Sequence, residues 1–464
     1  MRRSEVDRTK LAPMMAKYMS IKDNYEDTII FFRLGDFYEM FFEDAETVSK
    51  ELSLTLTGRN AGLSERVPMC GVPSHSYQGY VAKLVEKGYK VAICEQLTDA
   101  KEAKGMVERD VVQVITKGTI LDNLNFANDS NYIASIYDFS YYYALTYADI
   151  STGEIYSMIL NDLDSLYREL INRNIKEVIV NDKIDREVLY NLKAIYNILV
   201  TVTNNEVEYP EYKYIYEDVS DVRLITSIKH LLTYVTETKK SSLKYLKKVV
   251  LNKESEHLLF DFHTKKNLEL TETIRDNTRN NSLLAFLDKT KTAMGARLLK
   301  QNLLSPFTDI SIIERRYNYI ESLLTNFLVK ENLVTYLNDI YDLERLIGRI
   351  SYGNLNARDM YQLLKSLKIL PNIKEELSNI NYDKELKTID ELVDLLNRSI
   401  NPNAPLTLKE GNLIQDGYNY ELDELRKIKN NSQDFILAQE EEEKKRTGIK
   451  NLKIGYNKVF GYYI

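Results

Sequence analysis

The chain has 464 residues, which is too long for a single hydrophobic core, so two to four domains are expected. It is 44% hydrophobic and 28% charged, as soluble globular proteins are, and no apolar run approaches the ~18 residues of a membrane helix. The net charge of −7 is unlike that of a basic nucleic-acid-binding module, so charge alone does not predict DNA binding. The first residues lack the apolar stretch of a signal peptide, and Cys70 and Cys94 lie in apolar segments. A cytoplasmic protein with reduced, structural thiols is therefore expected.

The first strong element is a predicted buried strand at Thr28–Leu34. This segment is short, apolar and rich in β-branched and aromatic residues, and it ends at a turn signal formed by Gly35 and Asp36. Residues 37–52 then show helical spacing. This pattern places Phe37 at the point where the strand gives way to a helix.

Two interpretations of Phe37 follow from this position. With Glu39 two residues later, it could present an apolar wedge and a hydrogen-bond acceptor to one ligand, as in proteins that kink DNA from the minor groove. Alternatively, Phe37, Phe41 and Phe42 form the core face of the helix, and Glu39 is a solvated acid near its N-terminus.

Further motifs accompany this triplet between residues 15 and 118. They lie at residues 68–75, 80–85, 91–96, 107–112 and 114–119. In this order and spacing, the stretch resembles the mismatch-recognition domain of the MutS family of bacterial DNA mismatch repair proteins. The Phe-x-Glu triplet of that family is matched here by Phe37-Tyr38-Glu39.

The resemblance implies a role for each residue of the triplet and its turn. Phe37 would enter the minor groove and stack on a mismatched base, a contact worth roughly 1–3 kcal/mol in other aromatic–base systems. Glu39 would accept a hydrogen bond from that base, either as a partly protonated carboxyl or as a discriminator against normal pairs. Gly35 and Asp36 would shape the turn that aims Phe37. Arg59 and Arg66, which flank a predicted hairpin, are candidates for contacts with backbone phosphates.

A second block follows at residues 125–248. Strand-like runs at residues 132–136, 142–146 and 154–160 precede a helical stretch and another strand at 176–180, a pattern that suggests an α/β sandwich. The resemblance places an RNase H-like connector domain here. Asp149 ends a strand before a Ser-Thr-Gly turn, and with Asp182 it raises the alternative of a metal-dependent nuclease. A plain turn with solvated acids is the competing interpretation.

From about residue 253 the apolar period becomes helical. The two clearest stripes are Leu343, Leu346, Ile347, Ile350 and Met360, Leu363, Leu364, Leu367. After the break at Ser305-Pro306, either Asp309 or Ser311 could cap the next helix, with Glu314 completing a capping box in the second case. The resemblance assigns residues 253–425 to a helical core and lever domain and 426–464 to the start of a clamp domain.

The expected fold class is therefore multidomain, combining α/β and all-α parts. It comprises a mixed-sheet α/β domain at residues 1–120, the RNase H-like connector, the long-helix core and lever, and a truncated β clamp. The sequence contains no Gly-x-x-x-x-Gly-Lys-Ser/Thr phosphate cradle and no predicted catalytic or metal site, and it ends inside an apparent strand. We expect a fragment of a longer protein.

In that longer protein, the resemblance implies an ATPase domain using ATP and Mg²⁺ beyond Ile464, a homodimer and partnership with MutL. The expected partner of the present chain is double-stranded DNA with mismatches or small loops, and no membrane. A family relative acting on branched or recombining DNA is an alternative, although such relatives tend to lack the Phe-x-Glu domain.

Overall fold

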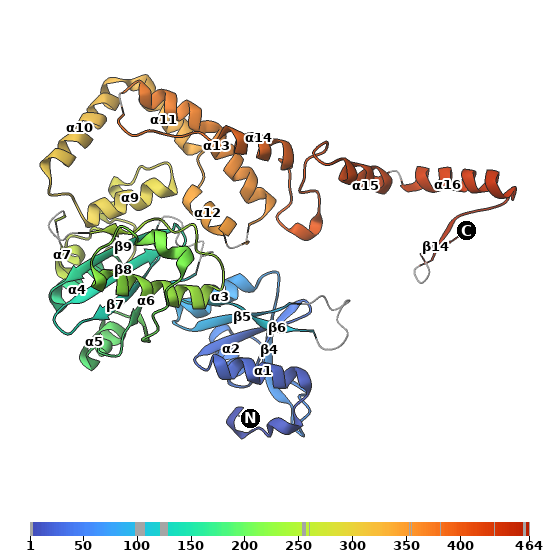
Figure 1. Cartoon of the computed structure of the whole chain (residues 1–464), viewed down its shortest axis with the longest axis horizontal. Coiled ribbons are helices and arrows are strands. Elements are labelled where there is room, and N and C mark those ends of the chain that lie inside the picture. Colours follow the sequence, from blue (N-terminus) through green and yellow to red (C-terminus); the bar gives the residue numbers. More distant parts are fainter. Residues whose placement is uncertain are drawn as a thin grey trace. The chain divides into compact units, whose positions relative to one another are not determined.

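The computed structural model describes two compact units of the chain. Unit 1 comprises residues 1–355 and 372–384, and unit 2 comprises residues 356–371 and 385–464. The structure describes residues 3–97, 107–120, 129–252, 257–258, 260–351, 353, 355–380, 382–430, 432–457 and 461–463. The content is mixed α/β, as the sequence predicts (Figure 1).

The first part of unit 1 is a six-stranded mixed sheet in the order β3-β4-β2-β1-β5-β6. Its strands are β1 (Thr28–Leu34), β2 (Phe37–Phe41), β3 (Thr57–Arg59), β4 (Val67–Pro73), β5 (Lys90–Gln96) and β6 (Arg109–Ile115). One apolar core lies between one face and α1 (Pro13–Asn24), and a second lies between the other face and α2 (Phe42–Leu52) with α3 (Tyr77–Glu86). The sheet is therefore covered on both faces.

The strand predicted at Thr28–Leu34 is confirmed as β1, but the helix predicted from residue 37 is wrong for its first five residues. Residues 37–41 form β2, which pairs antiparallel with β1 on one side and with β4 on the other. The helix begins only at Phe42, whose positive φ of 54° turns the chain out of the sheet. Phe37 therefore lies at the start of a strand in a hairpin.

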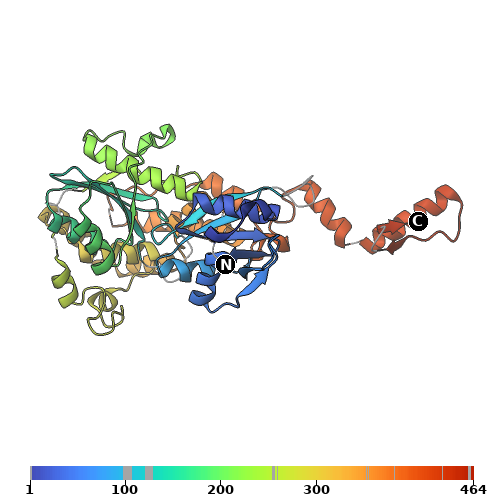
Figure 2. The same cartoon turned by 90° about the horizontal axis from the view of Figure 1, so that it is seen from below.

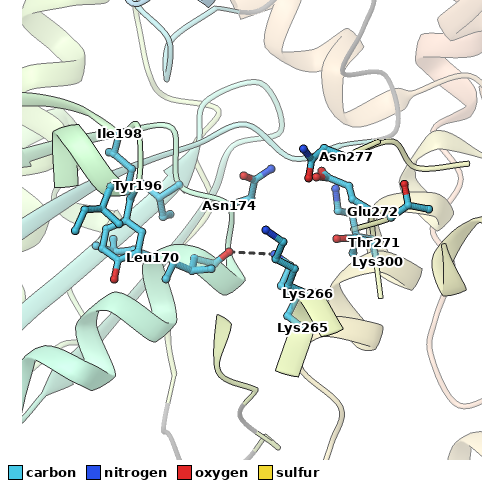
Figure 3. A pocket seen from close by; sticks show the side chains of 14 residues that line it. Leu170, Asn174, Tyr196, Ile198, Lys265, Lys266, Thr271, Glu272, Asn277 and Lys300 are labelled. Atoms are coloured by element: carbon cyan, nitrogen blue, oxygen red, sulfur yellow. Dashed lines mark hydrogen bonds between the residues drawn. The ribbon is translucent and has the colours of Figure 1, made fainter. Parts of the chain in front are cut away.

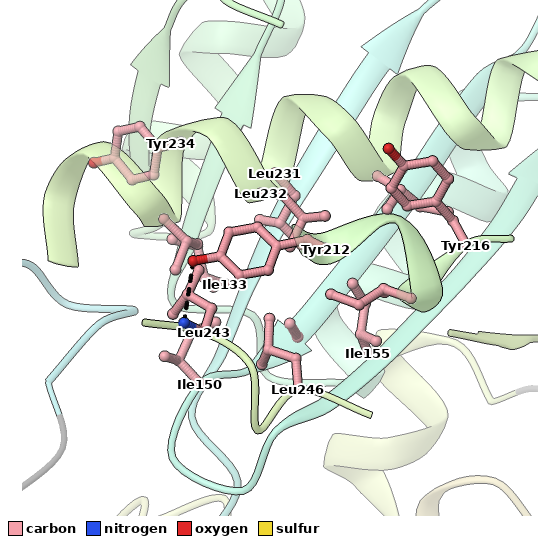
Figure 4. Packing of buried hydrophobic residues seen from close by; sticks show 14 of the residues in the cluster. Ile133, Ile150, Ile155, Tyr212, Tyr216, Leu231, Leu232, Tyr234, Leu243 and Leu246 are labelled. Carbon is pink, nitrogen blue, oxygen red and sulfur yellow. Dashed lines mark hydrogen bonds between the residues drawn. The ribbon is translucent and has the colours of Figure 1, made fainter. Parts of the chain in front are cut away.

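The second part of unit 1 is another mixed sheet, in the order β11-β10-β7-β8-β9-β12. Its strands are β7 (Tyr132–Asp138), β8 (Tyr143–Asp149), β9 (Glu154–Leu160), β10 (Glu177–Val180), β11 (Leu199–Val202) and β12 (Val250–Leu251). The predicted strands and the helical stretch, which is α4 (Leu163–Asn172), are confirmed. α6 (Val222–Lys239) packs on one face through the cluster shown in Figure 4. α4, α5 (Arg186–Tyr190) and the π-helical turn η4 (Asn191–Ile195) cover the other face, so the strands lie between two helical layers (Figure 2).

Helices make up most of the chain after residue 260. In unit 1 they are α7 (Phe262–Asn267), α8 (Leu283–Leu287), α9 (Ala293–Leu304), α10 (Ile310–Thr325), α11 (Phe327–Asn338) and α12 (Leu343–Ser351), and α13 (Ala357–Ser378) runs through both units. Asp309, not Ser311, caps α10 by accepting the Ser311 N–H at 2.8 Å, so the capping box with Glu314 is not formed. Unit 2 also contains α14 (Asp390–Ser399), α15 (Tyr420–Asn430), α16 (Ser432–Thr447) and an antiparallel pair, β13 (Gly455–Asn457) and β14 (Gly461–Tyr463).

None of the helices within the described ranges is both long enough and apolar enough to cross a membrane.

Candidate nucleic-acid interface

The candidate interface is built on the tight hairpin that joins β1 to β2. Leu34 pairs with Phe37, which leaves only Gly35 and Asp36 as loop residues. Gly35 has a φ of +58°, the sign that the first central position of a type II′ turn requires and that glycine adopts without a Cβ clash. The Asp36 carbonyl accepts the Ser74 N–H at 2.8 Å, which ties the loop to the end of β4. The loop is therefore held by the β1–β2 pairing on one side and by the contact with Ser74 on the other.

This hairpin holds Phe37 at its tip as an exposed aromatic side chain. Phe37 is 48% exposed, whereas Phe41 and Phe42 are 0% and 1% exposed in the core. The core interpretation is thus right for Phe41 and Phe42 and wrong for Phe37. An exposed ring on a braced two-residue hairpin is a suitable geometry for insertion between stacked bases.

Glu39 lies on the same face of β2 as Phe37, because side chains two residues apart in a strand share a face. Its carboxylate forms an ion pair with the Arg59 guanidinium, and the side chains are 15% and 35% exposed respectively. Arg59 shares this face through its pairing with Val67 on β4. Opposite Glu39, β4 carries Gly71, which has no side chain to cover the carboxylate from that side.

Arg66 lies on the other side of the sheet from this group. The β3–β4 hairpin predicted between Arg59 and Arg66 is confirmed. A Cβ on Gly58 would lie 2.9 Å from the Arg66 Cβ, and Gly58 faces away from its neighbour Arg59. The structure therefore brings Phe37, Glu39 and Arg59 to one face and separates Arg66 from them.

Sequence reasoning missed the residues that brace the hairpin from its opposite face. The Tyr38 hydroxyl donates a hydrogen bond to Glu95, and the Arg33 guanidinium lies 5.2 Å from the centre of the Tyr38 ring. Burial, and then Glu95, raise the pKa of Tyr38 well above its usual range, so the phenol remains a donor. Arg109 Nε donates to the Arg33 carbonyl at 3.1 Å. The alternation along β2 would have revealed Tyr38 had the segment been assigned as a strand.

Comparison with known proteins gives matches along nearly the whole chain. Three family models match: MutS domain I over residues 12–124, MutS domain II over 131–247 and MutS domain III over 263–451. The DNA mismatch repair protein MutS of Bacillus subtilis (strain 168) is 43% identical over 459 residues, which are 97% of this chain and 53% of that protein. The protein of the same name from Caldicellulosiruptor bescii is 44% identical over 470 residues, 98% of this chain and 54% of its own length.

The chain belongs to the MutS family. It spans about half the length of the MutS relatives that it matches. The match to MutS domain I contains all of the hairpin and both arginines, so the candidate interface lies within that family region.

In the region that matches MutS domain II, Asp149 has a structural role. It is completely buried, and its carboxylate accepts the Ser151 N–H at 2.8 Å, the Ser151 hydroxyl at 2.6 Å and the Asn131 N–H at 2.9 Å. The predicted Ser-Thr-Gly turn is present, but this acid is buried rather than solvated, whereas Asp182 is exposed. Across the residues that the structure describes, no group of three or more His, Cys, Asp or Glu is arranged to hold a metal ion. The carboxylate on which the nuclease alternative depends is occupied in closing the turn.

The two thiols are also structural. Cys70 and Cys94 are buried and unbonded to each other, in line with the sequence expectation. Burial raises the pKa of each thiol to about 12, and nearby Asp44 and Asp110 add to the effect at Cys70 and Cys94 respectively. Such thiols stay protonated and unreactive at neutral pH.

Proposed function

We propose that this chain binds mismatched duplex DNA as part of DNA mismatch repair. The observation that carries the proposal is the half-exposed Phe37 at the tip of a tight two-residue hairpin, with an acceptor and a cation on the same face. The name of the relatives, DNA mismatch repair protein MutS, supports it.

The proposed mechanism uses the weakness of a mismatched step. A mismatched or unpaired base stacks poorly, so kinking the duplex there costs less than at a paired step. Phe37 enters from the minor groove and stacks on that base, which replaces part of the lost stacking energy. Because every base has a π-face, this contact accepts many kinds of mismatch.

Glu39 and Arg59 act together in this proposal. A carboxylate close to DNA would be repelled by the phosphates, and the ion pair with Arg59 offsets that charge. Glu39 has two carboxylate oxygens, so it can accept a hydrogen bond from the mismatched base while it keeps its arginine partner. In a normal base pair no donor is displaced toward Glu39. The Glu39 carboxylate would then lose water without gaining a hydrogen bond, which disfavours binding to matched DNA. Arg66, on the other face, is left for a separate contact with a backbone phosphate.

The wider organisation is part of the same proposal. We assign residues 1–120 to mismatch recognition, 125–248 to a connector, 253–425 to the core and lever, and 426–464 to the start of a clamp. The strand arrangement supports an RNase H-like connector. β7, β8 and β9 form an antiparallel meander, β10 pairs in parallel with β7, and β11 pairs in parallel with β10. In the whole protein, we propose a cytoplasmic homodimer with an ATP- and Mg²⁺-dependent ATPase beyond Ile464, acting with MutL.

The test is a pair of equilibrium titrations with fluorescent duplexes that differ by a single G·T mismatch. The unaltered chain should bind the mismatched duplex more tightly, and Phe37→Ala should reduce the mismatch-to-match ratio by about 5–150-fold, which corresponds to 1–3 kcal/mol of stacking. Tyr141→Ala is the matched control, since Tyr141 is an 86% exposed aromatic residue outside the interface. An unchanged ratio in Phe37→Ala would refute the wedge. A preference for four-way junctions over mismatches in the unaltered chain would favour the alternative of a relative acting on branched DNA.

A further inference from the structure

A cavity of about 260 Å³ lies in unit 1, well apart in sequence from the hairpin. One side is formed by α4 and the π-helical turn η4 with the residues after it, and the other by α7, the segment after it and α9. Figure 3 shows Leu170, Tyr196 and Ile198 gathered on one side. Lys300, Thr271 and other polar side chains gather on the opposite side, with two lysines between them. We call the side with Leu170, Tyr196 and Ile198 the apolar wall, and the polar side together with its three lysines, Lys265, Lys266 and Lys300, the basic wall.

The basic wall has more positive than negative charge. Lys265, Lys266 and Lys300 line the cavity, and Glu272 is the one carboxylate among the lining residues. Lys265 Nζ donates to the Ile171 carbonyl at 3.1 Å, which leaves two of its three N–H groups for other acceptors. Lys300 Nζ forms an ion pair with the Asp129 carboxylate at 2.6 Å. With Asp129 counted, three lysines face two carboxylates, so the cavity has a small excess of positive charge.

Neighbouring lysines destabilise the charged form of Lys265. Burial, and then the nearby Lys300, lower the pKa of Lys265 to about 8, while Glu272 and Asp129 act in the opposite direction. Lys176 lies outside the set of lining residues, and burial, then Lys117 and Lys300, lower its pKa as well. A bound anion would relieve this repulsion and would favour protonated lysines.

The apolar wall offers a surface for a flat ring. The Tyr196 ring packs against Tyr167 at a centroid distance of 5.2 Å, which holds it in place beside the cavity. Ile195, at the end of η4, and Ile198 complete this surface. Short π-helical turns of this kind occur often at functional sites.

We propose that this cavity binds a nucleoside monophosphate, with the phosphate against Lys265 and Lys300 and the base against Tyr196 and its aliphatic neighbours. A compact anion alone would leave the apolar wall uncovered, whereas a base joined to one phosphate would contact both walls. The amide and hydroxyl groups of Asn174 and Thr271 are placed to contact the sugar or the phosphate edge. This site goes beyond the proposed function and does not depend on it.

The sequence makes the test simple, because the chain contains no Gly-x-x-x-x-Gly-Lys-Ser/Thr cradle that would bind nucleotides by itself. Isothermal titration of the unaltered chain at pH 7 with AMP, adenosine and inorganic phosphate compares the whole ligand with its two halves. We expect AMP to bind at least tenfold more tightly than either half. Lys265→Met and Lys300→Met should each weaken AMP binding at least tenfold, whereas Lys50→Met, at an exposed site on α2, should leave it unchanged.

A second measurement needs no variant. Acetylation of the lysines with a limiting reagent, followed by mass spectrometry, should show Lys265 and Lys300 protected by AMP and not by adenosine, with Lys50 acetylated equally in all samples. Absence of AMP binding, adenosine binding as tight as that of AMP, or AMP binding without protection of Lys265 and Lys300 would each overturn the proposal. Phosphate binding as tight as that of AMP would also overturn it, because the apolar wall would then contribute nothing.

Discussion

Replacing Lys265 by methionine is expected to stabilise the protein near neutral pH. The methionine keeps most of the length and apolar contact of the lysine stem but removes an ammonium group that is held among other cations. Loss of the hydrogen bond to the Ile171 carbonyl is the opposing term, at about 1 kcal/mol.

The magnitude follows from the pKa of this lysine. Burial and the charge of Lys300 lower the pKa from the ordinary 10.5 to about 8, and at 1.36 kcal/mol for each pH unit the gap corresponds to ~3 kcal/mol. Lys265 retains some exposure, so water screens part of this cost, and the lost hydrogen bond offsets more. We expect a net gain of about 1–2 kcal/mol in the free energy of unfolding at pH 7.

The pH dependence gives the decisive sign. Below pH 8 the lysine is protonated in the folded and unfolded states, so the folded state of the unaltered chain bears the full cost. Between pH 8 and 10.5 the folded lysine loses its proton while the unfolded one keeps it, so the cost declines as pH rises. The advantage of Lys265→Met should therefore fall by more than half between pH 7 and pH 10.

Urea unfolding followed by circular dichroism at both pH values measures this advantage. Lys50→Met is the control, since Lys50 is exposed on α2, and its effect should stay within about 0.5 kcal/mol at both pH values. A Lys265→Met variant that is less stable than the unaltered chain at pH 7 would refute the reasoning. So would an advantage that is the same at pH 7 and pH 10.

Two further predictions concern the scaffold of the hairpin domain. Asp44→Ala should lower the free energy of unfolding by about 3–5 kcal/mol, because the buried Asp44 carboxylate pairs with Lys22 at 2.8 Å. In urea unfolding, the control Glu46→Ala at an exposed position should show a much smaller loss. Equal losses in the two variants would contradict the stabilising role of the buried pair. Gly35→Ala should lower the free energy of unfolding by about 1–2 kcal/mol, because Gly35 has a φ of +58°. Gly79→Ala in α3, where a Cβ meets nothing within 4 Å, should instead raise it by about 0.5–1 kcal/mol. Thermal unfolding measures both, and a gain in both variants would show that a Cβ does not strain the turn.

The error over residues 37–52 shows what a local pattern leaves undecided. The spacing of Phe37 and Phe41 fits one face of a helix, but Phe37, Glu39 and Phe41 equally fit one face of a strand, with Tyr38 on the other. The strand forms because β1 and β4, which lie before and after it in the sequence, both offer edges for pairing. Pairing with β4 depends on residues about thirty positions away, which no window of this length contains.

The sequence was more informative about the site than about its support. Phe37 and Glu39 were predicted as a pair and do lie on one face, and Arg59 joins them. Arg66 was predicted together with Arg59 as a contact for backbone phosphates, and that role stays a prediction. The structure places Arg66 on the other face of the sheet from Arg59. The lysine cavity was not predicted, since its residues come from positions between 170 and 300 and share no local pattern.

The central claim, that Phe37 stacks on the mismatched base, is tested most directly with a fluorescent purine analogue placed at the mismatch. At protein concentrations that saturate the duplex, the unaltered chain and Tyr141→Ala should change the fluorescence of the analogue equally, and a matched duplex should show little change. Phe37→Ala, at its own saturating concentration, should lose most of that change. A full fluorescence change with Phe37→Ala would contradict the account.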